Sequence, residues 1–299
     1  DVLWEGPLQA AANAAEWRRA RAEYLAHAGY TCYADALATG ARWDSAVERW
    51  PEYDEVIFWF EHDLFDQLLL VRHLEWFGRR PLGRTVLSLI EIDRFPGVTP
   101  FHGLGQLEPE QLATLLPFRQ PVTAAQLALG ERAWSAFTGG DPLRLQTLMD
   151  QTTGTLPFLA AAIHRFLEEY PDQDGGVSRT ERSILEVLAE GRRSPVELFM
   201  ALQRMEESVF MGDTSYWRIV RGLDRGPSPL VQVNAVPGRR TLPDGTVEVT
   251  EAGRSVLAGK SDWVTLAGVD RWHGGVHLVG HSVPWRWDRE RGRLVTVAG

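Results

Sequence analysis

Val56-Ile57-Phe58-Trp59-Phe60-Glu61-His62-Asp63-Leu64-Phe65-Asp66-Gln67 is the stretch that decides the fold. Its apolar residues 56–60 are β-branched or aromatic, and a helical apolar period follows from residue 64 to about Phe77. A short run of this kind that opens into a longer helical pattern predicts a buried strand followed by a helix. Glu61, His62 and Asp63 then lie at the carboxyl end of the strand, where open α/β sheets bind their ligands.

A second strand is predicted over 85–93, which is rich in Val, Leu and Ile and again ends in acids. Two nearly continuous apolar strands with one helix between them predict a parallel βαβ unit with a right-handed crossover. Both acidic ends then share one edge of the sheet. The Gly- and Pro-rich segment 95–106 follows, and its glycines permit the close backbone approach that a ligand loop needs.

The segments around this unit read as helices. We expect a helix from Ala10 to about Ala28 and another over 41–50, with Gly40 as a break between them. Asp1 to Leu8 has the look of a loop that follows a strand, so a first strand of the sheet is expected before Asp1, outside this sequence. We therefore predict an α/β Rossmann-like domain over 1–107 and a helical insert or cover over 108–170, closed by a linker at 171–176.

The remaining segment, 177–299, is predicted to be a winged-helix-like domain with a terminal β-hairpin. Three short helices begin near Ser178, Ser194 and Asp213. Two strands, 230–233 and 247–249, follow, and the turn residues between them include Pro237-Gly238 and Asp244-Gly245. Three helices and then a hairpin is the order of a winged helix-turn-helix. The fold class is thus α/β, a small parallel Rossmann-like sheet with helical cover followed by this domain.

Several phrases of the chain resemble the bacterial domain-of-unknown-function family 1835, and the resemblance covers nearly the whole chain. They are Trp-Phe-Glu-His-Asp-Leu-Phe-Asp-Gln-Leu (59–68), Gly-Leu-Gly-Gln-Leu (103–107), Leu-Pro-Phe-Leu (156–159), Arg-Thr-Glu-Arg (179–182), Phe-Met-Gly-Asp (210–213) and Asp-Arg-Trp-His-Gly-Gly-Val-His-Leu (270–278). Members of that family usually begin with a short strand and Gly-Asp, of which only Asp1 is present here. The resemblance implies domain boundaries and no activity.

The composition of the chain limits the kinds of molecule that we expect it to bind. The 299 residues carry 40 acidic and 31 basic side chains, a formal charge of -9, which disfavours non-specific contact with nucleic acid or anionic lipid. The sequence shows no membrane span or signal peptide, so no membrane partner is expected. A single cysteine, Cys32, excludes an intramolecular disulfide and a Cys-rich zinc site, and it suits a reducing cytoplasm.

The candidate site gathers acids, one histidine and amides. Glu61, His62 and Asp63 are the candidate catalytic residues, as base, acid or ligand. Glu61, His62 and Asp66 could hold a divalent metal, because carboxylate oxygens and imidazole nitrogens are suitable ligands. In the alternative interpretation, Asp63 or Asp66 caps the following helix. The remaining candidate ligand-binding residues are Asp1, Glu5, Asp66, Gln67, Phe101, Gly103, Gly105 and Gln106.

Other motifs are weaker. Gly103-Leu104-Gly105 is too short for a dinucleotide fingerprint, and neither a P-loop nor a Gly-x-Ser-x-Gly elbow occurs. His273 and His277 could bind a metal, but packed or solvated strand histidines are the better interpretation, because no acidic or Cys partner lies at ligand spacing.

Two functions remain open. One is an enzyme or sensor for a small molecule at the sheet edge, either metal-assisted hydrolysis or binding of a phosphorylated ligand. The other is an effector-sensing regulator or an interaction protein that uses the winged helix. Only Arg218 and Arg221 would give the recognition helix positive charge, with Arg239 and Arg240 in the wing, so we rank protein contact above DNA contact. A protein partner or a homo-oligomer is compatible with this role.

Overall fold

The chain forms two compact units. The computed structural model describes residues 1–9, 13–151, 154–236 and 241–297. Unit 1 holds Asp1–Ile163 and Gly274–Val276, and unit 2 holds His164–His273 and His277–Gly299. The fold is of mixed α/β type, and each unit is described by itself.

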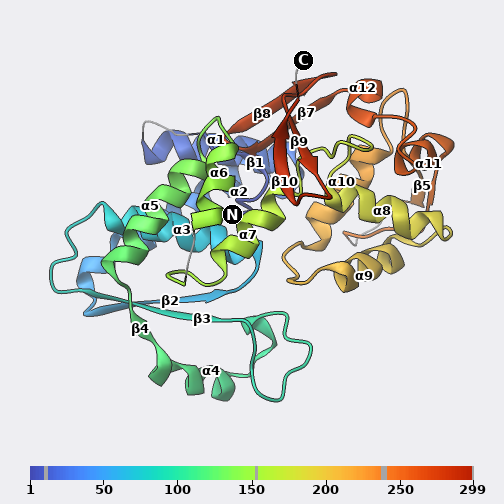
Figure 1. The fold of residues 1–299 in the computed structure, drawn as a ribbon. Coiled ribbons are helices and arrows are strands. Elements are labelled where there is room, and N and C mark those ends of the chain that lie inside the picture. Colours follow the sequence, from blue (N-terminus) through green and yellow to red (C-terminus); the bar gives the residue numbers. More distant parts are fainter. Residues whose placement is uncertain (10–12, 152–153, 237–240, 298–299) are drawn as a thin grey trace. The chain divides into compact units, whose positions relative to one another are not determined.

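The centre of unit 1 is a parallel βαβ arrangement (Figure 1). Strand β2 (Glu55–Glu61), helix α3 (Leu64–Gly78) and strand β3 (Val86–Ile92) follow one another along the chain. Phe58 lies opposite Leu89 in the parallel register. The predicted parallel pair and its crossover helix are thereby confirmed, and the carboxyl ends of both strands lie at one edge.

Helices α3 and α5 (Ala124–Phe137) pack closely in unit 1. Phe58 of β2 meets Phe77 of α3 with ring centroids 5.4 Å apart. Gly130 of α5 lies against Leu74, where an added Cβ would come within 2.4 Å of the Leu74 Cβ. Only glycine permits this approach, so α3 is buried between the strands and α5.

The predicted break at Gly40 is wrong. Helix α2 (Tyr33–Glu48) runs through Gly40 without interruption, after α1 (Ala14–His27). A glycine inside a helix costs only about 1 kcal/mol relative to alanine, which tertiary packing overrides. The side-chain carbons of Arg18 lie 3.5 Å from the place of a Gly40 Cβ, so the position is packed. Residues 10–12, part of the predicted first helix, lie outside the described residues.

The segment predicted as a helical cover is mostly helical but contains a short strand. Strand β4 (Gln120–Pro121) pairs antiparallel with β3, which gives the sheet order β2-β3-β4. Thr123 caps α5 with a capping box. The other elements of unit 1 are β1 (Gly6–Pro7), η1 (Trp50–Glu52), η2 (Leu104–Gln106), α4 (Pro109–Leu115), η3 (Leu116–Phe118), α6 (Leu143–Gln151) and the first part of α7 (Leu159–Leu167).

Unit 2 contains three helices followed by a two-stranded antiparallel sheet. These elements are α8 (Arg179–Ala189), α9 (Pro195–Met205), α10 (Asp213–Leu223), β5 (Val231–Val236) and β6 (Asp244–Val249). Arg193, between α8 and α9, forms an antiparallel bridge with Val247 of β6. Asp244-Gly245, predicted as part of the connecting turn, begins β6, because the strands are longer than their apolar runs. The predicted turn residues Pro237-Gly238 and the wing residues Arg239 and Arg240 lie outside the described residues.

The segment 171–176, predicted as a linker, is a turn in which Gln173 and Asp174 are exposed and the other four residues are buried. Asp172 is 2% exposed, and its Oδ1 accepts hydrogen bonds from the amides of Gly175 and Gly176. Its Oδ2 accepts a hydrogen bond from Arg182. Proline and glycine therefore mark a turn tied into the core of unit 2, and the division between the units falls earlier, between Ile163 and His164.

The carboxyl-terminal part forms two short helices and two hairpins. Trp287 lies opposite Leu294 in the last hairpin, and both side chains are buried. Among the described residues, no helix is long and apolar enough to cross a membrane. These elements are α11 (Glu251–Leu257), α12 (Trp263–Ala267), β7 (Val269–Gly274), β8 (Val276–Gly280), β9 (Trp285–Asp288) and β10 (Arg293–Thr296).

Candidate functional site

Gln67 joins the carboxyl ends of the two parallel strands. Its side chain is fully buried, and its Nε2 donates to the backbone oxygen of Glu61 at 2.8 Å and to Oε1 of Glu91 at 2.7 Å. Its own Oε1 is buried without a hydrogen-bond partner among the described residues. The structure therefore brings Gln67 into the predicted site, as an amide that holds an acid of the neighbouring strand.

Asp63 and Asp66 fix the junction between β2 and α3. Asp63 is the N-cap of α3 and accepts a hydrogen bond from the amide of Asp66 at 3.0 Å. Asp66 accepts one from the amide of Glu61 at 2.6 Å. The capping interpretation is confirmed for Asp63, because its oxygen satisfies an amide that the helix leaves free.

Glu61 anchors the Gly-rich loop that follows β3. Its Oε1 accepts a hydrogen bond from the amide of Leu104 at 2.5 Å. Gly103, at φ +148°, lies so close that an added Cβ would come within 2.0 Å of Oε2. Gly103 thus has two reasons to be glycine, the backbone conformation and the contact. The predicted proximity of this loop to Glu61 is confirmed.

His62 lies between two aromatic rings. Its ring centroid is 6.4 Å from that of Phe101, with the planes 26° apart, and 5.9 Å from that of Phe158 in an edge contact. Its Nδ1 is buried and has no hydrogen-bond partner among the described residues. Burial lowers the pKa of His62, which opposes the attraction of Asp93. His62 is therefore a mainly neutral imidazole with an unused nitrogen.

The carboxylates of this edge hold protons unusually strongly. Burial raises the pKa of Glu91 to about 7, and the hydrogen bond from Gln67 opposes the rise. Burial also raises the pKa of Asp63 to about 7, against the hydrogen bond from the Asp66 amide. The pKa values of Glu61 and Asp66 are likewise raised by burial. An acid with a pKa near 7 can both give and take a proton at neutral pH.

Asp1 and Glu5 belong to a different cluster. Arg21 is buried and donates to Asp1 Oδ1 at 2.8 Å and to the backbone oxygen of Glu5 at 3.0 Å. The Glu5 carboxylate accepts hydrogen bonds from the hydroxyls of Tyr24 and Tyr30. Both predicted ligand-binding acids therefore hold the amino-terminal segment against α1, and none of these bonds involves Glu61 or His62.

The structure gives the remaining site predictions little support. Gln106 closes its own loop, because its Oε1 accepts from the amide of His102 and its Nε2 donates to the backbone oxygen of Pro100. Gly105 lies in the η2 turn of the same loop. Across the described part of the chain, no three His, Cys, Asp or Glu residues form a group that could hold a metal ion. Glu61, His62 and Asp66 are thus neighbours without the geometry of a metal centre.

The Arg-Thr-Glu-Arg phrase of unit 2 is an ion-pair network. Arg179 pairs with Glu168, Thr180 donates to Glu169, Glu181 pairs with Arg271 at 2.8 Å, and Arg182 pairs with Asp172. Arg165 belongs to the same network and donates hydrogen bonds to Glu206 at 2.7 and 2.9 Å and to Glu169 at 2.6 Å. Each polar residue of the phrase therefore has a structural partner.

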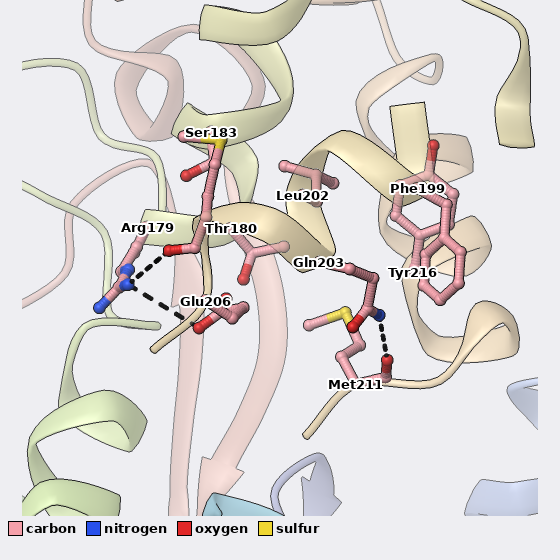
Figure 2. A pocket seen from close by; sticks show the side chains of 10 residues that line it. Arg179, Thr180, Ser183, Phe199, Leu202, Gln203, Glu206, Met211 and Tyr216 are labelled. Carbon is pink, nitrogen blue, oxygen red and sulfur yellow. Dashed lines mark hydrogen bonds and ion pairs between the residues drawn. The ribbon is translucent and has the colours of Figure 1, made fainter. Parts of the chain in front are cut away.

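A hollow lies beside this network, between α8, α9 and α10 (Figure 2). Figure 2 shows Gln203 bound to the carbonyl of Met211, with the rings of Phe199 and Tyr216 together on one wall. Arg179 and Glu206 form its charged rim. These two charges are opposite, and the lining also contains polar side chains such as Thr180 and Gln203 beside the apolar ones.

The arginines of α10 are already engaged. Arg218 has its Nε buried, and burial lowers its pKa to about 10, with Arg271 adding repulsion. Arg221 pairs with Asp224 at 2.8 Å. The two described side chains expected to neutralise DNA phosphates are therefore directed to the protein itself.

The two tail histidines serve the packing of unit 2. His273 is 7% exposed and stacks on Tyr170 with centroids 4.9 Å apart. His277 stacks on Trp272 at 4.3 Å and lies 2.7 Å from an oxygen of Asp270. The interpretation of His273 as a packed strand histidine is confirmed. Asp270 is an acidic partner that the sequence spacing did not show.

Sequence reasoning missed Glu91 as a site residue. Glu91 lies opposite Phe60 in the parallel register. Side chains alternate between the two faces of a strand, so Glu91 lies on the same face as Leu89, towards α3. This alternation could have placed Glu91 beside Gln67. No family model, curated protein or solved structure matches this chain. The family resemblance drawn from the quoted phrases therefore stays a prediction.

Proposed function

We propose that unit 1 binds a small molecule at the carboxyl edge of β2 and β3, and that this molecule carries a positive charge or several hydrogen-bond donors. The observation that carries the proposal is the Gln67–Glu91 bond within a group of four acids, of which Asp63 is buried and the other three are half-buried. Glu61, Asp63, Asp66 and Glu91 all have raised pKa values because burial strips water from them. A ligand cation would relieve this cost.

The charge of the site argues against a phosphorylated ligand. The hydrogen bonds to these four carboxylates come from backbone amides and from Gln67, and within the described part of the chain none comes from Lys or Arg. Phosphate recognition needs cations or a converging set of free amides. An amine or amidine suits the site better, and Phe101 and Phe158 beside His62 add aromatic surface for its carbon atoms.

Within this proposal Glu91 is the residue that exchanges a proton. Its pKa of about 7 lies where a general base or acid is most effective. Gln67 positions it, and His62 offers an unused nitrogen on the same edge. Glu61 and Asp63 have other tasks, as loop anchor and helix cap, so the catalytic roles first assigned to them pass to Glu91.

Calorimetric titration with putrescine and agmatine tests the proposal, and inorganic phosphate serves as the opposite probe. We expect the two amines to bind and phosphate not to bind. Glu91→Gln should weaken amine binding, whereas Glu110→Gln, the same change on the exposed face of α4, should leave it unchanged. Absence of binding by both amines, or equal binding by the Glu91→Gln protein, would overturn the assignment.

A second role belongs to unit 2, for which we propose a winged helix-turn-helix arrangement. The order α8, α9, α10, β5, β6 and the bridge from Arg193 to Val247 support it. Because Arg218 is half-buried and Arg221 is paired, contact with protein suits this module better than contact with DNA. Binding to duplex DNA at low salt that weakens in Arg221→Ala would reverse this ranking.

A further inference from the structure

The outer face of α9 is apolar at its centre. Val196 and Met200, one turn apart, are 48% and 50% exposed, whereas Leu198 and Leu202 on the inner face are buried. Single exposed apolar side chains are ordinary, but two at helical spacing form a stripe. Methionine at its centre is flexible and adapts to a partner surface.

Opposite charges flank Met200 along this helix. Glu197 is exposed in the first turn of α9, and its bonds from Ser194 lower its pKa, so it stays ionised. Arg204 is exposed in the last turn. Among the described residues Arg204 has no hydrogen-bond or ion-pair partner. The last turn of α9 therefore carries an unused cation.

This arrangement is complementary to itself when the helix is reversed. With a rise of about 1.5 Å per residue, Glu197 lies about 4.5 Å before Met200 along the axis and Arg204 about 6 Å after it. A twofold axis at Met200 would place Glu197 of one copy within about 1.5 Å, along the axis, of Arg204 of the other. Val196 would lie at the height of the aliphatic part of the other Arg204.

We propose that α9 pairs antiparallel with α9 of a second copy of this chain. Met200 packs on its symmetry mate, and two Glu197–Arg204 ion pairs flank the contact. A parallel pairing would set Arg204 against Arg204, so the charges select the antiparallel one. A partner surface of a single charge would repel either Glu197 or Arg204. A second copy offers an opposite charge to both residues, which favours the second copy as occupant.

The contact area is small, so the dimer is weak. An 11-residue helix spans about 16 Å, and contacts of this size lie at the low end of specific interfaces. We expect the full chain to dimerise in the micromolar range or above. This inference uses α9 alone and is independent of the ligand site in unit 1.

Sedimentation equilibrium over a wide range of protein concentration tests the proposal. Met200→Asp and Arg204→Glu should each raise the dissociation constant by about tenfold or more, since this corresponds to only about 1.4 kcal/mol. The double variant with Glu197→Gln and Arg204→Glu should bind more tightly than Arg204→Glu alone, because it no longer sets two acidic side chains against each other. Glutamine keeps the capping box, so circular dichroism should show an intact helix.

Arg192→Glu is the matched control, since Arg192 is exposed in the same unit but lies outside α9. It should leave dimerisation unchanged. A chain that stays monomeric at every concentration would overturn the proposal, as would a dimer that Met200→Asp and Arg204→Glu leave intact. Equal weakening by Arg192→Glu would show a general charge effect and would also overturn it.

Discussion

The side-chain amide of Gln67 lies 2.7 Å from Oε1 of Glu91, and this bond ties the first turn of α3 to the end of the neighbouring strand. The same nitrogen reaches the backbone oxygen of Glu61. One buried amide thereby holds both strand ends in register. The helix that carries Gln67 also covers part of the Glu91 side chain, and this burial raises the pKa of Glu91, whereas the bond from Gln67 opposes the rise.

Glu91 should make unit 1 less stable as pH rises. Its pKa is raised to about 7 in the folded state. At pH values between the ordinary pKa of a glutamate and this raised pKa, the folded state therefore binds more protons than the unfolded state. Its contribution is present at acid pH and is lost as pH rises through about 7. Glu91→Gln should stabilise the protein by about 2 kcal/mol at about pH 8 and change little at about pH 4. Urea unfolding at both pH values measures this, with Glu110→Gln as control.

Ligand affinity should depend on the same group. A cation favours the ionised form of Glu91, so amine binding should strengthen as pH rises through about 7 and should release protons. Calorimetry of putrescine binding in buffers of different ionisation enthalpy measures both effects. In Glu91→Gln the proton release should disappear, and a release of unchanged size would assign it to another group.

Gly103→Ala should detach the loop that covers Glu61. The new Cβ would strike the Glu61 carboxylate, and a φ of +148° is unfavourable for alanine. We expect a loss of about 2 kcal/mol or more in unfolding free energy, together with faster proteolysis within 93–107. Gly97→Ala is the matched control, since Gly97 also has a positive φ but has nothing within 4 Å of an added Cβ. Equal losses in both variants would show that backbone strain alone is responsible.

Arg165→Met should destabilise unit 2 strongly. Arg165 is buried and pairs with Glu169 and Glu206. Without it Glu169 would be a buried charge that has lost its ion-pair partner, and Glu206 would keep only the longer contact with Arg179. Removing one side of a buried ion pair costs about 3–5 kcal/mol. Arg193→Met, at a partly exposed arginine that pairs with exposed Glu190, should cost at most about 1 kcal/mol. Chemical unfolding followed by circular dichroism compares the two.

His273 should make unit 2 sensitive to acid. Burial lowers its pKa to about 3, and Arg271 contributes repulsion. The unfolded state therefore binds more protons below the ordinary histidine value, and unfolding free energy falls as pH drops from about 6.5 towards 3. His273→Phe should lose this part of the acid sensitivity, about 3 kcal/mol between about pH 7 and pH 4. An unchanged slope would assign the acid sensitivity to other groups.

Local sequence patterns were sufficient to predict strand β2 and the starts of several helices. The apolar run 56–60 predicted β2, and Ser178 and Ser194 predicted helix starts that the structure confirms as capping boxes. These signals depend on residues three or four positions apart, which the sequence displays directly. Gly40 and the turn 171–176 show the limit, because long-range packing overrode local preference at both places.

The sequence by itself determined the βαβ unit, the acidic edge of its sheet and a helix cap at Asp63 or Asp66, because each depends on the order of neighbouring residues. Only the tertiary structure decided that Gln67 binds Glu91 and that Asp1 and Glu5 belong to another cluster, since these are contacts between segments far apart in the chain. It likewise showed that Arg218 and Arg221 are engaged within the protein. Burial and partner choice follow from three-dimensional packing, and they set the pKa values and the free charges on which function depends.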